Sequence, residues 1–313
     1  MKNPNNWIFL QQCPGCDSGF GHWTALKLNR RGFYIFATCL DEKGKGASEL
    51  RKKAKFPDKM KVLGLNVTKE SDVSNVVDQV AKILSEKKHE LHAIVNNAGI
   101  CEVGDIEWSE SGPSVEDYKR AMDVNCFGVI RVTRGFLPFL RKSRGRVVNL
   151  TSIMSRTNYP GINPYCVSKA AAVKFTDGLQ AEIVRFGVTP VSIEPWYYKT
   201  PLLNVNTVTT MLRKKWEKAS LEVRTDYGDE YFESMIRGAI FTVSSPHNVI
   251  DRPEDVVEAI EDAVVSISPE PVYRVITPGI GIIFWILHDL LPWDLSFIAR
   301  RIHHWITLKF LVK

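Results

Sequence analysis

The sequence predicts an α/β fold, a doubly wound, seven-stranded parallel sheet with a C-terminal helical extension. Short apolar runs typical of buried strands alternate along the chain with amphipathic stretches of helical periodicity. A glycine-rich segment also lies between the first apolar run and the first helix. With 313 residues and 44% hydrophobic content, the chain can form one large domain with a well-buried core, and a second domain is not required.

The N-terminal half is expected to contain four strands, at residues 7–12, 33–38, 60–65 and 92–95. Helices are expected at about residues 20–31 and 71–87. In the second of these helices valines recur on one face, which indicates that this face packs against the sheet. Ser71 is the candidate N-cap, because its hydroxyl can accept a hydrogen bond from a free backbone N–H.

The C-terminal half is expected to contain three strands, at residues 145–150, 188–194 and 272–276, with helices at residues 114–142, 164–186 and 253–267. Asn125 lies midway along the first of these helices, where asparagine is unfavourable because its amide competes for backbone groups. It is either a functional residue or a tolerated polar residue at a helix–helix contact. Residues 201–242 carry many large apolar side chains, which suit an apolar pocket or an ordinary packed helix pair.

The glycine-rich segment predicts a dinucleotide site. Glycine can adopt positive φ and lets backbone N–H groups approach a phosphate at the start of a helix. The candidate contacts in this segment are Gly15, Ser18, Gly19, Phe20 and Gly21. Asp41 follows the second strand, where a carboxylate would bind ribose hydroxyls and repel a 2′-phosphate. NAD is therefore favoured and NADP is the alternative, while an ordinary turn carboxylate is the competing interpretation of Asp41.

Three residues in the middle of the chain form a candidate catalytic unit. Tyr165 and Lys169 are four residues apart, so on a helix both side chains project from one face. An ammonium beside a phenol stabilises the phenolate, so the Tyr165 pKa is expected to fall from about 10 towards working pH. Ser152 follows a buried strand, and its hydroxyl is a candidate to hold a substrate oxygen. On its own, a tyrosine followed four residues later by a lysine is an ordinary solvated helix pair, so the interpretation depends on the other motifs in the chain.

These motifs occur together with Asn97-Ala98-Gly99 and Asn125 in an order that resembles the short-chain dehydrogenase/reductase family. The resemblance covers nearly the whole chain and is strongest to the retinol and hydroxysteroid dehydrogenase branch, to which D-3-hydroxybutyrate dehydrogenase is also related. It implies NAD(P)-dependent interconversion of a hydrophobic alcohol and its ketone or aldehyde. It also implies a Rossmann-like catalytic domain at residues 1–277, with a substrate lid at about 201–242.

The resemblance assigns roles to individual residues. Tyr165 would exchange a proton with the substrate, Ser152 would hold the substrate oxygen, and Lys169 would lower the phenol pKa and bind ribose. Asn125 would order a relay water. A generic turn is the alternative for the Asn-Ala-Gly motif. Together with the glycine-rich segment, the implied cofactor contacts are Asp41, Asn66, Val67, Asn97, Ala98, Gly99, Tyr165, Lys169, Pro195 and Thr200.

Two positions depart from the family pattern. Pro14 stands where the family has threonine, and Trp196 stands where it has glycine, on the nicotinamide side of the site. These departures motivate an alternative function, in which a catalytically weak or inactive family member binds a lipid or a partner protein. D-3-Hydroxybutyrate is the alternative substrate.

Composition excludes other classes of protein. The net charge is +6, but the basic residues are scattered and no nucleic-acid-binding motif is present, so nucleic acid is not an expected partner. The six cysteines are expected to be reduced, and no metal site is predicted. Cys13 and Cys16 form a CxxC pair for which redox or metal use is a minor alternative. No signal peptide is expected, because the apolar run at residues 7–10 is too short.

The tail at residues 278–313 is apolar and basic. Its apolar run at residues 280–287 is much shorter than the ~20 residues of a spanning helix. Residues 295–313 have apolar side chains near helical spacing, which suits either a helix in the membrane interface or a cap over the substrate pocket. An intracellular location at the endoplasmic reticulum membrane is expected, with cytosol and mitochondrion as alternatives. The small side chains of Ala170 to Ala172 also suit close packing, either with a neighbouring element or with the second subunit of a homodimer.

Overall fold

The computed structural model describes residues 7–12, 18–108, 115–202, 204–245 and 249–276, and for residues 7–12 it describes the backbone alone. The sequence predictions for Cys13, Pro14, Gly15, Cys16 and the tail at 278–313 lie outside these residues. Within them, no helix is long and apolar enough to cross a membrane.

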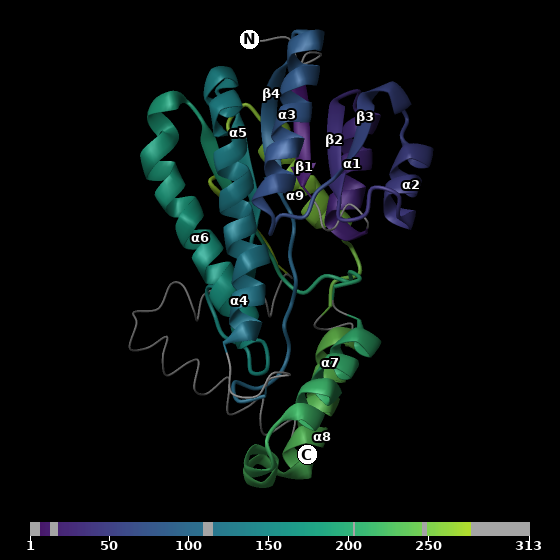
Figure 1. Ribbon diagram of the computed structural model, residues 1–313, viewed down its shortest axis with the longest axis vertical. Helices are drawn as coiled ribbons and strands as arrows, with labels where there is room; N and C mark the ends of the chain where they lie inside the picture. Colours follow the sequence, from purple (N-terminus) through teal and green to yellow (C-terminus); the bar gives the residue numbers. More distant parts are fainter. Residues whose placement is uncertain (1–6, 13–17, 109–114, 203, 246–248, 277–313) are drawn as a thin grey trace.

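The centre of the fold is a parallel sheet of seven strands in the order β3-β2-β1-β4-β5-β6-β7 (Figure 1). All six strand pairs are parallel, which confirms the predicted doubly wound sheet. The strands are β1 (Trp7–Gln12), β2 (Tyr34–Cys39), β3 (Met60–Gly64), β4 (Glu90–Asn96), β5 (Arg146–Leu150), β6 (Thr189–Pro195) and β7 (Val272–Val275).

Helices cover both faces of the sheet. One face packs against α1 (Gly19–Arg30), α2 (Lys45–Lys53) and α9 (Glu254–Val265). The other face packs against α3 (Glu70–Lys87), α5 (Val129–Ser143) and α6 (Asn163–Ile183). Valine, leucine and isoleucine dominate both cores, as expected for a sheet that is buried on two sides. Helix α2 is short and highly charged, and its weak apolar pattern explains why it was not predicted.

The helix predicted at residues 114–142 is wrong as a single α-helix. The chain instead forms α4 (Glu116–Met122), a π-helical segment (Asp123–Gly128) and α5. The wider π turn re-aims the side chains of this segment, and such turns are frequent at functional sites. Asn125, the residue that was unfavourable for an α-helix, lies in this π segment and is fully buried.

The N-cap prediction for Ser71 is also wrong. Helix α3 begins at Glu70, Lys69 occupies the N-cap position, and Ser71 lies in the first turn. No side chain caps this helix. Glu70 and Asp72 place negative charge in the first turn, where it stabilises the positive end of the helix dipole.

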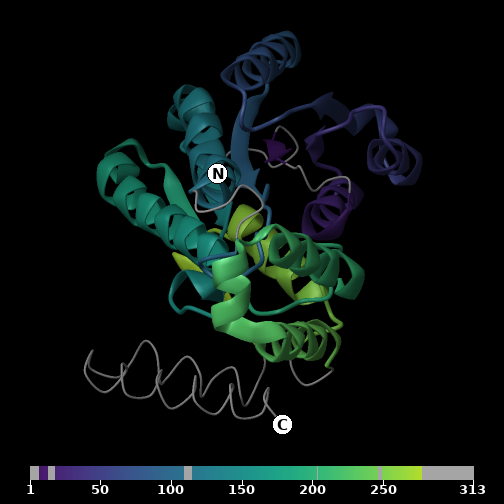
Figure 2. The same ribbon diagram turned by 60° about the horizontal axis from the view of Figure 1, so that its bottom comes forward.

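The segment after β6 forms two helices, α7 (Val205–Lys218) and α8 (Leu221–Ser244), which project from the sheet domain at its lower end in Figure 1. Figure 2 shows them in front of the sheet. They share an aromatic core in which the rings of Trp216 and Phe232 stack at 4.9 Å and Trp108 packs against both. This segment coincides with the predicted lid at 201–242, and its apolar residues both pack the helix pair and line an apolar pocket.

Candidate active site

A cleft of ≈ 370 Å³ opens at the carboxyl ends of the strands. The sheet order reverses between β1 and β4, so the connections from these strands lead to opposite faces and leave a crevice where open α/β sheets bind ligands. The start of α1, the ends of β4, β5 and β6, and α6 line it. The predicted site residues that line this cleft are Ser18, Gly19, Phe20, Asn97, Gly99, Ser152, Tyr165, Lys169, Pro195 and Thr200.

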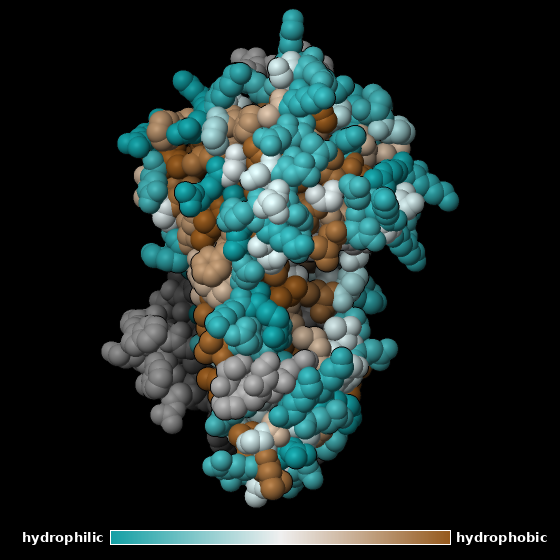
Figure 3. Space-filling model, viewed as in Figure 1, coloured by the Kyte–Doolittle hydropathy of each residue, from teal (hydrophilic) through white to brown (hydrophobic). Residues whose placement is uncertain are grey.

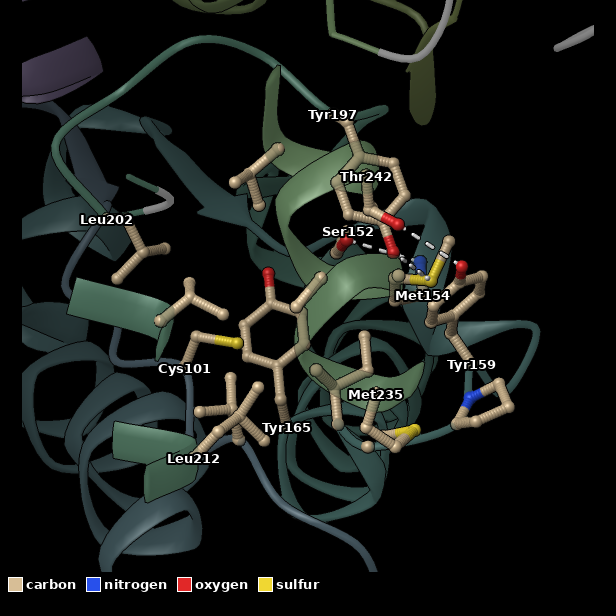
Figure 4. Close-up of a pocket in the computed structure, with 18 of the residues that line it drawn as sticks. Cys101, Ser152, Met154, Tyr159, Tyr165, Tyr197, Leu202, Leu212, Met235 and Thr242 are labelled. Atoms are coloured by element: carbon tan, nitrogen blue, oxygen red, sulfur yellow. Dashed lines mark hydrogen bonds between the residues drawn. The ribbon is translucent and has the colours of Figure 1, made fainter. Parts of the chain in front are cut away.

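A second, apolar cavity of ≈ 100 Å³ lies between the cleft and the lid helices (Figure 4). Val208 and Leu212 of α7 and Met235 of α8 form one side of it. In Figure 3, hydrophobic side chains gather in the recess between the sheet domain and the helices below it. Four residues line both this cavity and the cleft: Ser152, Tyr165, Trp196 and Leu202.

The predicted catalytic unit is assembled at the junction of the two cavities. Tyr165 lies in the first turn of α6, and the Lys169 ammonium lies 5.8 Å from the centre of the Tyr165 ring. Ser152 and Tyr165 lie together in the lining of both cavities. The Ser152 oxygen accepts a hydrogen bond of 3.1 Å from the backbone N–H of Met154, which fixes its position.

The predicted fall in the Tyr165 pKa is wrong for this structure. Burial raises the pKa of the Tyr165 phenol above its ordinary value, and the neighbouring Ser152 side chain offsets this only in part. Burial also lowers the pKa of Lys169 to about 8. The physical reason is the same for both groups, because removal from water penalises phenolate and ammonium alike.

Lys169 keeps hydrogen-bonding capacity. Its ammonium donates a hydrogen bond of 2.9 Å to the Leu150 carbonyl, the only acceptor found for it among the described residues. A lysine ammonium has three donors, and Lys169 lines the cleft while only 4% exposed. The arrangement therefore offers a cation to a ligand in the cleft.

The Asn125 side chain forms hydrogen bonds with two other segments, the loop after β4 and helix α6. Its amide nitrogen donates 2.9 Å bonds to the Ile100 carbonyl and the Ser168 hydroxyl, and its oxygen accepts a 2.8 Å bond from the Ile100 N–H. Ser168 in turn donates to the Tyr165 carbonyl at 2.7 Å. A Cβ atom on Gly99 would lie 3.4 Å from both the Asn125 oxygen and the Lys169 nitrogen. Glycine at this position therefore leaves room between these two polar groups.

The predicted Asn-Ala-Gly motif borders both the cleft and the core. Asn97 and Gly99 line the cleft, whereas Ala98 is buried in the core on the α3 side of the sheet. The preceding Asn96 donates to Asn149 of β5 at 2.7 Å and to Thr133 of α5 at 3.1 Å. These side-chain bonds tie the central strands together at the edge where the cleft opens.

The start of α1 is shaped for close approach. Gly19 has φ +68°, a conformation that glycine adopts without strain, and it is the first residue of the helix. Phe20 packs edge-to-face against Tyr198 at 5.9 Å, which links α1 to the segment after β6. Gly21 is buried within α1 and does not line the cleft.

Three other predicted cofactor contacts lie outside the lining of the cleft. Asp41 is exposed, and its carboxylate accepts a 2.9 Å bond from the Lys43 N–H, so it also shapes the turn after β2. The Asn66 side-chain oxygen accepts bonds from the N–H and hydroxyl of Thr68. Val67 is fully buried in the core.

Sequence reasoning missed several residues of the apolar cavity, including Cys101, Tyr159, Tyr197 and Thr242. One signal could have identified Tyr197, since it lies two residues beyond a parallel strand, where ligands bind in this class of sheet. The others come from two loops, after β4 and after β5, and from α8, and only the tertiary structure brings them to the cavity.

Comparison with known proteins gives consistent matches. A family model described as short chain dehydrogenase matches residues 13–210. Retinol dehydrogenase 7 of Rattus norvegicus is 36% identical over 270 residues, which cover 86% of this chain and 80% of that protein. Human 17-beta-hydroxysteroid dehydrogenase type 6 is 33% identical with the same coverage. Mitochondrial D-beta-hydroxybutyrate dehydrogenase of Rattus norvegicus is 36% identical over 71% of this chain, which spans 64% of that protein.

Solved structures share the fold. A short-chain dehydrogenase from Streptomyces avermitilis superposes with a TM-score of 0.68 at 22% identity, covering 99% of this chain and 98% of that one. A 3-ketoacyl-(acyl-carrier-protein) reductase from Brucella melitensis, solved with NADH, has a TM-score of 0.62 at 20% identity and covers 86% of this chain and 96% of that one.

Proposed function

The chain belongs to the short-chain dehydrogenase family, and on that premise we propose that it interconverts an uncharged hydrophobic alcohol and its carbonyl compound, with Tyr165 as the proton-exchanging residue. One observation carries this proposal. The Ser152 and Tyr165 side chains line both the polar cleft and the apolar cavity, so a molecule in either space can reach them.

The cleft suits a nicotinamide dinucleotide, the cofactor of this family. Ser18, Gly19 and Phe20 at the start of α1 would face its phosphates, and the Lys169 ammonium would donate to its ribose. Pro195 and Thr200 would lie beside its nicotinamide. When bound, the cofactor accepts or gives the hydride. Asp41 favours NAD over NADP, because a carboxylate repels a 2′-phosphate.

The chain's own residues handle the proton. Because burial raises the pKa of Tyr165, its oxygen carries a proton at neutral pH and can donate it to a carbonyl oxygen during reduction. In oxidation the phenol first releases its proton to solvent, and the resulting phenolate takes the proton from the alcohol. Ser152 would hold the substrate oxygen against the phenol, and Asn125 would hold the relay water while it fixes α6 through Ser168.

The lining of the apolar cavity favours a neutral substrate. Among the described residues it contains no lysine, arginine or histidine, and most of its side chains are aliphatic or aromatic. A carboxylate buried there would lack a counter-charge, which is costly. A retinol- or steroid-like alcohol is therefore preferred over D-3-hydroxybutyrate.

The deciding experiment is the variant Tyr165→Phe. It removes the hydroxyl and keeps the ring, so we expect nucleotide binding to persist and turnover to disappear. A panel of retinol, 3α- and 17β-hydroxysteroids and 3-hydroxybutyrate would be assayed with NAD and with NADP, following reduced cofactor by absorbance. Unchanged turnover in Tyr165→Phe would remove Tyr165 from this role.

A second candidate function is that of a lipid- or partner-binding protein with little activity. It is motivated by Trp196, whose bulk replaces glycine and lines both the cleft and the cavity. Titration with NAD and NADP separates the two functions, since a chain that binds neither nucleotide cannot be an active dehydrogenase.

We also infer assembly and location from sequence and exposure. Val167 and Ala170 are exposed on α6, and such a face of small and apolar side chains suits a second copy of the chain. The basic, apolar tail at 278–313 suits a peripheral contact with the endoplasmic reticulum membrane. Sedimentation of Ala170→Glu against the parent chain tests the dimer, and vesicle flotation with and without the tail tests the membrane contact.

A further inference from the structure

Three hydroxyl groups interrupt the apolar wall of the substrate cavity. They belong to Tyr159, Tyr197 and Thr242, and Figure 4 shows them gathered around Met154. None of them takes part in the proton exchange proposed for Ser152 and Tyr165. An apolar pocket usually contains a few polar groups that fix the orientation of its ligand.

The hydrogen bonds of these hydroxyls are poor or incomplete. Tyr197 donates to the Met154 sulfur at 3.6 Å, and a thioether is a weak acceptor. Tyr159 and Thr242 share one bond of 3.2 Å. Each of these two hydroxyls has one donor hydrogen, and their shared bond uses only one of the two. Within the described part of the chain, the other hydrogen has no acceptor. The wall therefore offers donors that a ligand oxygen would satisfy better than sulfur does.

These groups can bind an uncharged acceptor. Burial, with the nearby Tyr159 adding to it, raises the pKa of Tyr197 well above its ordinary value, so its phenol is an uncharged donor at neutral pH. No cationic side chain lines the cavity within the described part of the chain. A ketone, hydroxyl or ether oxygen fits this setting, and a carboxylate does not.

Part of this donor group lies on the same loop as one of the reacting hydroxyls. The loop that carries Met154 and Tyr159 also carries Ser152. Arg156 in this loop forms two hydrogen bonds, of 2.7 and 2.8 Å, with the fully buried carboxylate of Glu194 on β6. The Ser155 hydroxyl also donates to the Ser152 carbonyl at 2.6 Å. Because the three donor hydroxyls line one cavity, a substrate in it could contact them and the reacting hydroxyls at once.

We propose that Tyr197, together with the Tyr159–Thr242 pair, binds a second, uncharged oxygen of the substrate and makes the enzyme selective for rigid apolar alcohols that carry two oxygens. This inference rests on the proposed function, because it assigns a second contact of the same substrate. It places retinol, which has one oxygen, below dioxygenated steroids.

Matched substrate pairs test the selectivity. Androsterone is compared with its 17-deoxy analogue, and dihydrotestosterone with its 3-deoxo analogue, so that each pair differs only in the second oxygen. In the pair that is turned over, we expect kcat/KM to be about tenfold higher for the steroid with two oxygens than for its partner with one. A tenfold ratio is the effect expected from about one hydrogen bond. A ratio near one in both pairs would overturn the inference and leave the proposed function intact.

Variants locate the effect. In Tyr197→Phe the ratio is expected to fall to within about twofold, and Thr242→Val should reduce it less, because the pair supplies one donor of two. Tyr34→Phe on β2, far from the cavity, is the matched control and should keep the tenfold ratio. If Tyr197→Phe and Thr242→Val both keep it too, these hydroxyls do not recognise the second oxygen.

If no member of either pair is oxidised, that result counts against the proposed function. A binding measurement then tests the inference separately. The diketone 5α-androstanedione and its parent hydrocarbon are titrated against the full chain, following tryptophan fluorescence, to which Trp196 in the cavity wall contributes. Binding of the diketone that weakens about tenfold in Tyr197→Phe supports the inference. Equal quenching of both proteins contradicts it.

Discussion

Two lysines are almost completely buried, and their surroundings are opposite. Lys169 on α6 is 4% exposed, and its only acceptor among the described residues is a backbone carbonyl. Lys215 on α7 is 2% exposed, and its ammonium lies 3.1 Å from a Glu102 oxygen and 2.9 Å from an Asp117 oxygen. One cation is buried without a counter-charge, and the other is surrounded by carboxylates.

The Lys215 network is balanced and joins three segments. Arg120 on α4 binds both carboxylates as well, so two cations face two anions. Burial alone would raise the pKa of Glu102, but its bonds to Arg120 and Lys215 hold that pKa below its ordinary value. The network fastens α7, which forms one wall of the substrate cavity, to α4 and to the segment after β4, which forms another.

The contrast separates structural from functional charge. A buried cation with two carboxylates is held in one geometry, and breaking such a network is costly. A buried cation without a partner is itself unfavourable, and a fold retains it where a ligand or a reaction needs it. We therefore expect Lys169 to matter for activity and Lys215 for stability.

The largest expected effect is on activity, in Lys169→Met. Loss of the cation beside the phenol should lower kcat/KM by about 10³-fold, the scale of acid–base catalysis, while the chain stays folded. Lys174→Met changes an exposed lysine on the same helix and should keep full activity. Wild-type turnover in Lys169→Met would end the functional interpretation of this lysine.

The stability of Lys169→Met should depend on pH. The pKa of Lys169 is about 8 in the folded chain and 10.5 ordinarily, a difference that corresponds to about 3 kcal/mol. Between these values the unfolded wild type binds more protons than the folded one, so wild-type stability rises with pH. Without added nucleotide, the variant should be the more stable protein below pH 8, and its advantage should shrink towards pH 10.5. Urea unfolding at pH 7 and pH 10 measures this, and a constant difference would contradict it.

Lys215→Met should give the opposite result. It leaves two buried carboxylates with one cation, and the free energy of unfolding should fall by about 3–5 kcal/mol. The neighbouring exposed Lys214→Met is the control and should change it by less than about 0.5 kcal/mol. The double variant Lys215→Met, Asp117→Asn removes one charge of each sign and should recover part of the loss. A single variant as stable as its control would show that the network contributes little.

The sequence predicted one side of this contrast and not the other. The seven strands and the Ser152, Tyr165 and Lys169 unit were predictable, because apolar runs and fixed spacings are local properties. The Lys215 network was not, since its members are separated by up to 113 residues. No sequence pattern brings them together before the lid helices have packed.

The direction of the Tyr165 pKa shift also could not be predicted from the sequence. Spacing placed Lys169 beside Tyr165 correctly but suggested a lowered phenol pKa. The sign depends on how much water reaches both groups, which is a property of the whole fold. The π segment around Asn125 is similar, because the sequence showed an unfavourable residue without showing how the helix accommodates it.

The smallest expected effect concerns the glycine that makes room for the network. Gly104 has φ +136°, and a Cβ atom there would lie 2.8 Å from the Lys215 side chain, so Gly104→Ala should lower the free energy of unfolding by about 2 kcal/mol. Gly178 on α6 has open space and helical backbone, so Gly178→Ala should raise it by about 0.5–1 kcal/mol. Thermal or urea unfolding of both variants decides the matter. If Gly104→Ala is tolerated like Gly178→Ala, the lysine stem can move aside, and the network is a looser attachment for α7 than its distances indicate.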